Sequence, residues 1–273
     1  MERWISGKSG VKIYVNDINP TAKQGILFIH GWPCNHHLFE YQYNILPWYE
    51  IRCIGIDMRG FGLSDKPWIG YDYDTLADDV RSVIEELQLK DIVLAGHSTG
   101  GAVAIRYMAR HKGYGVSKLA LFAAAAPSLI EKPYFPYGQP ESVVDHIIDQ
   151  TYTNRPQMLK DFGKMFFYQE VTESVMDWLF LLGLSAASWS TIAISKSWLT
   201  EELFSDLPLI DVPTLIMQGY HDAVCPYSLS LAQHEGIANS KLVTFPDAGH
   251  GAFFEVKDQF NSELISFINN EGR

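Results

Sequence analysis

The sequence is poor in cysteine and in positive charge, and it has no long apolar run. Its 273 residues include only 3 cysteines, an odd number without metal-like spacing, which argues against a complete disulfide framework. Lysine and arginine total 21 against 32 aspartates and glutamates, a formal net charge of -11. Because no cluster of basic residues is present to neutralise phosphates, a nucleic-acid partner is not expected.

The absence of long apolar runs bears on the cellular location of the protein. No stretch of about 18 apolar residues indicates a membrane span, and the opening MERWISGKSG lacks the apolar core of a secretion signal. We therefore expect a cytoplasmic protein with no membrane partner. Apolar residues still make up 47% of the chain, enough for a large core, and the length favours one α/β domain with an insertion.

Short apolar runs alternate with helical patterns along most of the chain. GILFIHG (25–31) and DIVLAG (91–96) have the length and composition of buried parallel strands. The spacing of apolar residues in 72–89 and 99–111 predicts helices. Such alternation predicts a mostly parallel, doubly wound sheet with helices on both faces.

The alternation stops between Pro127 and Asp206, where no run is typical of a buried strand and mixed helical patterns follow four prolines. We interpret 127–206 as a helical cap inserted after the sixth strand, with 1–126 and 207–273 forming the core domain. Four aromatic residues of the cap are candidates for the substrate pocket, of which we expect at most two to line it: Trp178, Phe180, Trp189 and Trp198.

One serine stands in a pattern that points to chemistry. The stretch 96–100, GHSTG, matches G-x-S-x-G and falls between a predicted strand and a predicted helix. The turn there is so sharp that a Cβ at either glycine would collide with backbone, and the serine hydroxyl is held exposed. Ser98 is therefore the candidate nucleophile, and the alternative is a serine in a packing turn without chemistry.

A neutral serine needs a base and an acid that orients the base. In this arrangement the acid and then the histidine follow the serine, each beyond a later strand. Asp222 follows PTLIMQG (213–219), and His250 lies in a glycine-flanked loop after KLVTF (241–245). We predict His250 as the general base and Asp222 as its partner. Asp247, only three residues before His250, is the disfavoured alternative acid.

The substrate oxygen that becomes negative needs preorganised donors. The backbone N–H of Thr99, directly after the nucleophile, is one candidate. The second is the N–H of Trp32 in the loop FIHGWP (28–33), with the indole forming part of the pocket wall. Alternatively, His30-Gly31 is a plain turn and Trp32 a core residue.

Neighbouring histidines have a simpler interpretation than catalysis or metal binding. His36 and His37 lack a third ligand at suitable spacing, so we expect them to be solvated or helix-capping, and we expect no metal site. His97 and His221 are expected to be structural.

Two further features also favour a structural role. Cys34 and Cys225 are expected to be small buried side chains rather than catalytic thiols. The segment DMRGFGLSDKP (57–67) lacks a strand–GxGxxG–helix arrangement, so we expect a structural loop at the site's rim, with turns stabilised by Asp57 and Arg59.

With these residues identified, the chain resembles the α/β-hydrolase superfamily over essentially its full length. More narrowly it resembles the cofactor-free haloperoxidase, perhydrolase and esterase group. The resemblance rests on HGWP, DMRGFGLSDKP, YDYDTLADDV, GHSTGG, IDVPTLIMQGYHDAVCPY and DAGHG. It implies the α/β-hydrolase fold with a helical cap, a Ser98–Asp222–His250 triad, and no metal or organic cofactor. A homodimer is a further expectation at the level of the family.

The resemblance also implies an activity. Members of the group hydrolyse small esters or lactones, and many let hydrogen peroxide replace water, which yields a peracid that oxidises halide. Thr99 stands where the perhydrolases commonly carry methionine, which argues against efficient perhydrolysis. A serine nucleophile disfavours the haloalkane dehalogenases and epoxide hydrolases, which use aspartate, and HGWP is unlike the proline iminopeptidase pattern.

We therefore expect a serine hydrolase that cleaves a small, neutral carboxylic ester or lactone through an acyl-enzyme intermediate. A perhydrolase is the first alternative, and a hydrolase of C–C bonds in β-diketone-like compounds is a more distant one. A ligand receptor on the same fold, limited to a single turnover, is the alternative from another class. Steady turnover would distinguish the enzyme from the receptor.

Overall fold

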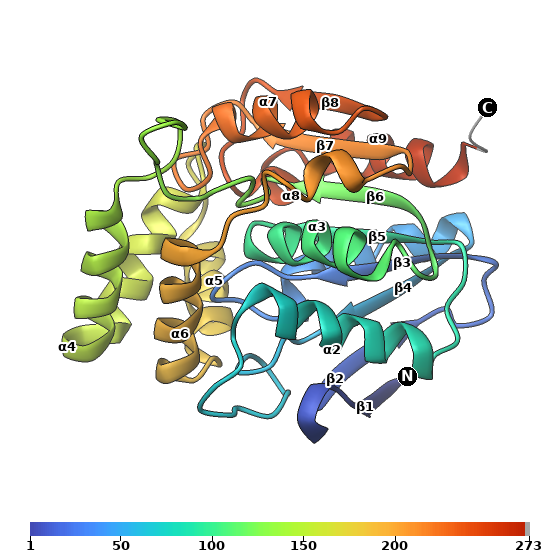
Figure 1. Cartoon of the computed structure of the whole chain (residues 1–273), viewed down its shortest axis with the longest axis horizontal. Coiled ribbons are helices and arrows are strands. Elements are labelled where there is room, and N and C mark those ends of the chain that lie inside the picture. The colour runs from blue at the N-terminus through green and yellow to red at the C-terminus, as the bar shows by residue number, and fades with distance from the viewer. Residues whose placement is uncertain (271–273) are drawn as a thin grey trace.

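The centre of the protein is one eight-stranded sheet, shown in Figure 1 for a computed structural model that describes residues 1–270. The strand order is β1-β2-β4-β3-β5-β6-β7-β8. β2 is antiparallel to both of its neighbours, and all neighbouring strands from β4 to β8 are parallel. The strands are β1 (Glu2–Ser6), β2 (Lys12–Ile18), β3 (Gln24–Ile29), β4 (Ile51–Ile56), β5 (Ile92–His97), β6 (Val116–Phe122), β7 (Thr214–Gly219) and β8 (Ser240–Phe245).

Helices cover both faces of this sheet. One face carries α2 (Tyr73–Glu86), α3 (Thr99–His111) and α7 (Tyr227–Gly236), and the other carries α1 (Glu40–Tyr43), α8 (Ala252–Glu255) and α9 (Lys257–Asn269) (Figure 1). Successive strand residues point to opposite faces, so Leu27 and Ile29 join the α2–α3 core while Ile26 and Phe28 join the α9 core. Short 3-10 helices connect the elements: η1 (Lys8–Gly10), η2 (His36–Phe39), η3 (Leu46–Tyr49) and η4 (Leu207–Leu209).

This architecture confirms the predicted fold class. The apolar runs at 25–31 and 91–96 form β3 and β5, and the two predicted helices are α2 and α3. Asp72 caps α2 by accepting a 2.8 Å hydrogen bond from the backbone N–H of Thr75. The edge strand β1 was not predicted, because its sequence ERWIS has a single buried residue, Ile5.

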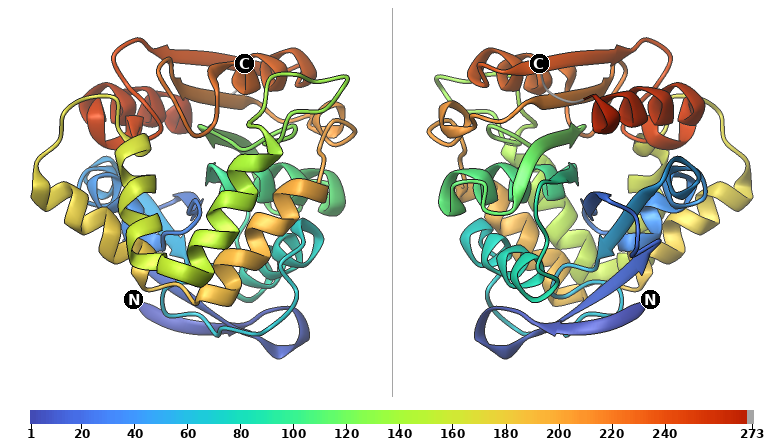
Figure 2. Two further views of the ribbon diagram at one scale, coloured as in Figure 1. Left: turned by 90° about the vertical axis from the view of Figure 1, so that its left-hand side faces the viewer. Right: turned by 90° about the vertical axis from the view of Figure 1, so that its right-hand side faces the viewer.

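The cap consists of three helices between β6 and β7: α4 (Glu141–Phe166), α5 (Glu173–Leu184) and α6 (Ser188–Thr200). They stand together at one end of the sheet, on the left in Figure 1 and facing the viewer in the left panel of Figure 2. The helical path of α4 is interrupted at Asn154 (φ -155°, ψ 65°), two residues before Pro156. This position agrees with the expected insertion after the sixth strand, and 127–206 remains our proposal for its bounds.

The cap helices also bear on the expectation about membranes. Within residues 1–270, no single helix is long and apolar enough to cross a membrane. Among the same residues, α5 and α6 together have the length and composition of a membrane span, but the two helices are bent by 90° from one another.

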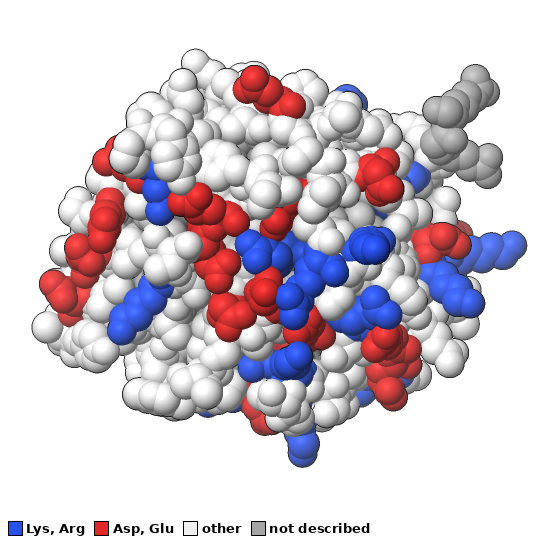
Figure 3. Space-filling model, in the orientation of Figure 1, with Lys and Arg blue, Asp and Glu red and all other residues white. Residues whose placement is uncertain are grey.

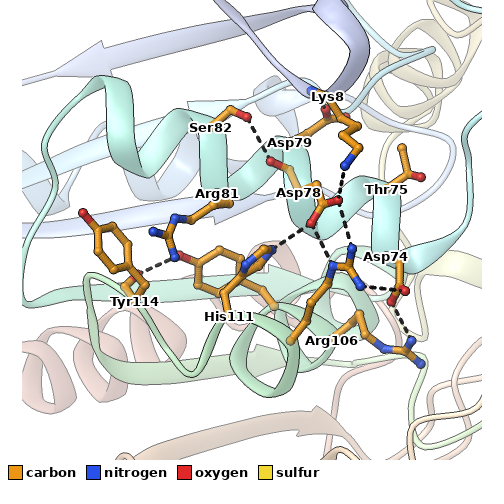
Figure 4. A network of polar contacts seen from close by, with 12 residues as sticks. Lys8, Asp74, Thr75, Asp78, Asp79, Arg81, Ser82, Arg106, His111 and Tyr114 are labelled. Carbon is orange, nitrogen blue, oxygen red and sulfur yellow. Dashed lines mark hydrogen bonds and ion pairs between the residues drawn. The ribbon is translucent and has the colours of Figure 1, made fainter.

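Basic side chains gather over α2 and α3 in space although they do not cluster in the sequence (Figure 3). Arg106 pairs with Asp74 at 2.8 Å (Figure 4) and with Asp206 at 2.7 Å. Arg110 pairs with Asp74 and with Asp78 at 2.8 Å each. These arginines therefore connect the two helices to each other through carboxylates, which neutralise their charge.

Candidate active site

Ser98 occupies a strained position at the junction of β5 and α3. Its backbone has φ 54° and ψ -121°, a positive φ that side-chain-bearing residues rarely adopt. A Cβ on Gly96 would collide with the carbonyl of Gly100, and a Cβ on Gly100 would collide with the carbonyl of Ile29. The two glycines of the G-x-S-x-G pattern therefore allow the close backbone packing that this turn requires.

His250 and Asp222 meet at the carboxyl ends of β8 and β7. His250 Nδ1 lies 2.8 Å from Asp222 Oδ2, and both side chains are fully buried. The other carboxylate oxygen, Oδ1, accepts hydrogen bonds of 2.8 Å from the N–H groups of Val224 and Cys225. The contact leaves Nε2 of the imidazole as the free ring nitrogen, and within residues 1–270 it is buried without a hydrogen-bond partner.

His97, the residue before the serine, connects the backbone of His250 to the serine turn. His97 Nε2 lies 3.0 Å from the carbonyl oxygen of His250, and the two imidazole rings are 4.5 Å apart. Within residues 1–270, Ser98 Oγ makes no hydrogen bond to His250 Nε2 and lies 3.8 Å from Cys225 Sγ. A long serine–histidine contact is common in free enzymes, where it tightens once substrate is bound.

The two predicted oxyanion donors flank the serine. Within the described chain, neither the Trp32 nor the Thr99 N–H donates a hydrogen bond to another protein group. A Cβ on Gly31 would lie 2.5 Å from His97 Nδ1 and 3.0 Å from Ser98 Cβ, so the Trp32 loop packs directly against the nucleophile. Both N–H groups are thus available to an anion.

His30 fixes the loop that carries Trp32. Its Nε2 accepts a 3.0 Å hydrogen bond from the Met58 N–H, and its Nδ1 lies 2.9 Å from the Gly31 carbonyl oxygen. Burial lowers the pKa of His30 to about 4, so the ring is neutral at pH 7. A neutral ring can accept on one side and donate on the other, which fixes the tautomer with the proton on Nδ1.

Ser98 opens onto a cavity of about 180 Å³ between the sheet and the cap. Most of the wall is apolar and comes from α4 and from the segments around Trp32 and Leu129. The lining residues are Trp32, Ser98, Leu129, Ile130, Gln139, Val143, Val144, His146, Ile147, Gln150, Met158, Asp161, Phe162, Met165, Trp198 and Val224. Such a cavity suits a compact apolar group placed beside the serine hydroxyl.

Only one of the four candidate cap aromatics, Trp198, lies on this cavity. Trp178 packs instead against Tyr41 and Phe254. Phe180 and Trp189 also have other contacts than this cavity.

The ammonium nitrogen of Lys160 lies over the Phe180 ring, 5.6 Å from the centroid of that ring. Trp189 donates its indole N–H to the Pro67 carbonyl at 3.0 Å and lines a separate hollow with Trp68. Neither residue, nor Trp178, is part of the cavity lining. Helical periodicity alone does not distinguish which of these aromatic side chains reach the cavity.

His36 differs from its prediction as a solvated or capping residue. It is 2% exposed, and its Nδ1 lies 2.8 Å from Asp57 Oδ1. Asp57 also accepts a 2.7 Å hydrogen bond from the Leu63 N–H, in agreement with its expected role in the turns of the rim loop. Across residues 1–270, no group of three or more His, Cys, Asp or Glu is arranged to hold a metal ion.

The cysteine prediction is confirmed for Cys34 and Cys225, which are 1% and 0% exposed. Burial, together with the negative charge of Asp222, raises the pKa of the Cys225 thiol well above its usual value. The thiol is therefore protonated at neutral pH and a poor nucleophile.

Two polar residues that support the site were not predicted from the sequence. Gln218, fully buried at the end of β7, donates a 2.8 Å hydrogen bond from Nε2 to Asp222 Oδ2. Glu255 accepts hydrogen bonds from the N–H groups of Gly249 (2.8 Å) and Tyr168 (2.7 Å), which connects the His250 loop to the end of α4. A glutamine at the end of a strand and a glutamate five residues after the histidine gave no signal in a single sequence.

The sheet, the serine turn and the buried histidine–carboxylate pair together define an α/β hydrolase. Comparison with protein families agrees, because the model of the alpha/beta hydrolase family matches residues 26–263. The chain belongs to this family.

Individual relatives extend the likeness over the full length. The chain is 45% identical over 270 residues to the AB hydrolase superfamily protein YisY of Bacillus subtilis (strain 168), covering 99% of this chain and 100% of the relative. It is 32% identical over 276 residues to the bifunctional esterase/perhydrolase DCH of Acinetobacter calcoaceticus (97% and 99% covered). Among solved structures, an esterase from Exiguobacterium antarcticum is 41% identical and superimposes with a TM-score of 0.96 over 99% of this chain and 100% of that one.

Proposed function

We propose that this protein is a serine hydrolase that cleaves a small, neutral carboxylic ester or lactone through an acyl-enzyme intermediate. The observation that carries the proposal is the buried 2.8 Å contact between His250 Nδ1 and Asp222 Oδ2 beside Ser98. The similarity to the Exiguobacterium esterase supports the same activity.

In the first half of the reaction, Ser98 Oγ attacks the substrate carbonyl carbon while His250 Nε2 takes the hydroxyl proton. The carbonyl electron pair moves to oxygen, where the N–H groups of Trp32 and Thr99 stabilise the negative charge. Asp222 holds the imidazole in the required tautomer and stabilises the imidazolium. The intermediate then collapses, the carbon–oxygen bond to the alcohol breaks, and His250 gives that alcohol its proton.

In the second half, water attacks the acyl-enzyme. His250 Nε2 takes a proton from the water as its oxygen bonds to the acyl carbon, and the same two N–H groups hold the oxyanion again. Cleavage of the bond to Ser98 Oγ releases the carboxylic acid, and the serine recovers its proton from His250. Ser98 and His250 are then in the protonation states in which they began.

The cavity indicates the substrate class. Its volume of about 180 Å³ and its largely apolar wall suit a short acyl or alcohol group without charge. Asp161, at the lining, pairs with Lys164 at 2.6 Å, so it supplies no uncompensated charge that would bind an ionic substrate.

Covalent labelling tests the nucleophile. A fluorophosphonate that forms a stable adduct with activated serines is expected to add once per chain, at Ser98, as shown by intact mass and peptide mapping. Ser98→Ala should lose the adduct, and Cys225→Ala, which removes the neighbouring thiol, should keep it. An adduct on another residue, or none on the unaltered protein, would contradict the proposal.

Perhydrolysis is the second candidate, favoured by the likeness to the Acinetobacter esterase/perhydrolase. In that reaction hydrogen peroxide takes the place of water on the acyl-enzyme and a peracid leaves. Turnover of an ester with peroxide, bromide and monochlorodimedone would give a bromination signal that disappears in Ser98→Ala. Absence of the signal during active ester hydrolysis would exclude this reaction.

A further inference from the structure

Helix α6 of the cap hydrogen-bonds to both residues that carry the candidate oxyanion donors. The Trp32 indole Nε1 donates to the Thr191 carbonyl oxygen at 3.1 Å. The Trp198 indole Nε1 donates to Thr99 Oγ1, also at 3.1 Å. The three side chains of Trp32, Thr99 and Trp198 are buried, so bulk water does not compete for these bonds.

The two indoles also contact each other. The rings of Trp32 and Trp198 meet edge to face with centroids 5.0 Å apart. The start of α6 is joined to the core domain, because Gly60 O accepts hydrogen bonds from the Ala187 N–H at 3.0 Å and from Ser190 Oγ at 2.8 Å. The helix is thus held in place at one end and contacts the oxyanion residues along its length.

We propose that Trp198 is a positioning residue: its indole N–H holds Thr99, and through it the first backbone N–H of α3, in the direction that stabilises the oxyanion. The inference rests on the proposed function and extends it. It assigns the cap a part in the rate of reaction in addition to binding. A displaced donor stabilises the transition state less than a fixed one while leaving substrate binding nearly unchanged.

Two variants remove the hydrogen bond from its two ends. Trp198→Phe keeps an aromatic ring and loses the N–H, and Thr99→Val keeps the shape and loses the hydroxyl. Each is expected to lower kcat for a p-nitrophenyl ester about tenfold, with KM changed less than about twofold. The double variant should also lose about tenfold rather than about a hundredfold, because both changes remove the same bond.

A matched control lies on the same helix. Trp189→Phe also deletes an indole hydrogen bond of α6, to the Pro67 carbonyl, away from the cavity, and should leave kcat unchanged. An alkylboronic acid, which binds serine as a tetrahedral adduct, should bind Trp198→Phe and Thr99→Val about tenfold more weakly than it binds the unaltered protein.

Several outcomes would overturn the inference. Unchanged kcat in either single variant, a raised KM as the only effect, or multiplicative losses in the double variant would show that Trp198 only fills space. If Trp198→Phe did not fold, Thr99→Val would decide alone, since it leaves every ring in place. If the unaltered protein neither turned over esters nor bound the boronic acid, the proposed function itself would be wrong, and this inference with it.

Discussion

His97 stands directly before the candidate nucleophile, and its Nε2 donates a 3.0 Å hydrogen bond to the carbonyl oxygen of His250. Burial, reinforced by the nearby His250, lowers the pKa of His97 well below its usual value, so the ring is neutral. A carbonyl can only accept, which places the single ring proton on Nε2. His97, the last residue of β5, therefore connects the backbone of the candidate base to the residue next to the candidate nucleophile.

Removing this contact should slow catalysis without changing what binds. His97→Leu keeps an apolar body of similar size but leaves the His250 carbonyl without its donor, which also costs about 1–3 kcal/mol of unfolding free energy. We expect kcat for a short p-nitrophenyl ester to fall about tenfold. Steady-state kinetics and urea unfolding check both effects, and unchanged kcat would show that the contact is dispensable.

The choice of acid is tested by a matched pair of asparagine variants. Asp222→Asn should lower kcat about 10⁴-fold, because an amide no longer favours the proton on Nδ1 of His250. Asp247→Asn, at an exposed position in the same loop as His250, should lose less than about twofold. A large loss for Asp247→Asn with a small one for Asp222→Asn would reverse the assignment.

Stability should depend on pH through His30. Its pKa is lowered from 6.5 to about 4 by burial, so the unfolded chain takes up a proton between these values while the folded chain does not. The unfolding free energy is then fully present above pH 6.5 and falls as the pH drops toward 4, by about 1.4 kcal/mol per pH unit from this residue.

Urea unfolding of the protein and of His30→Gln between pH 4 and pH 6.5 measures this contribution. We expect the variant to be less stable at pH 7 and its unfolding free energy to decline less steeply with falling pH. Parallel curves for the two proteins would show that His30 does not titrate as its burial requires.

The size of the cavity should limit the substrate. Phe162 lines the cavity and packs edge to face on Trp32 at 5.0 Å, so Phe162→Ala enlarges the space beside the serine. We expect the ratio of kcat/KM for p-nitrophenyl octanoate over acetate to rise several-fold. Leu181→Ala, at an exposed cap residue, is the control and should leave the ratio unchanged. A lowered ratio in Phe162→Ala would show that the acyl group does not bind in the space beside Phe162.

Much of the fold follows from local patterns in the sequence. The strands from β3 to β7 are largely buried runs of apolar residues, and α2 and α3 show helical spacing beside them. The edge strand β1 shows no such pattern, since four of its five residues are not buried. Its pairing with β2 depends on a partner that local composition does not reveal.

The positions of the candidate site residues follow from the sequence for a related reason. Parallel strands end at one edge of the sheet, so Ser98, Asp222 and His250, each placed just after a strand, come together there. Gln218 and the pairing of Trp198 with Thr99 were not predictable, because they depend on side-chain directions between segments far apart in the chain. The same reason applies to Trp189, whose indole faces the rim loop.

The central claim is that Ser98 is the nucleophile of a turning-over ester hydrolase. The most direct test is the steady-state rate of p-nitrophenyl acetate and butyrate hydrolysis by the unaltered protein and by Ser98→Ala. We predict many turnovers per chain, reduced about 10⁴-fold or more in the variant. More than a few per cent of activity left in Ser98→Ala, or a burst of one equivalent that then stalls, would contradict it.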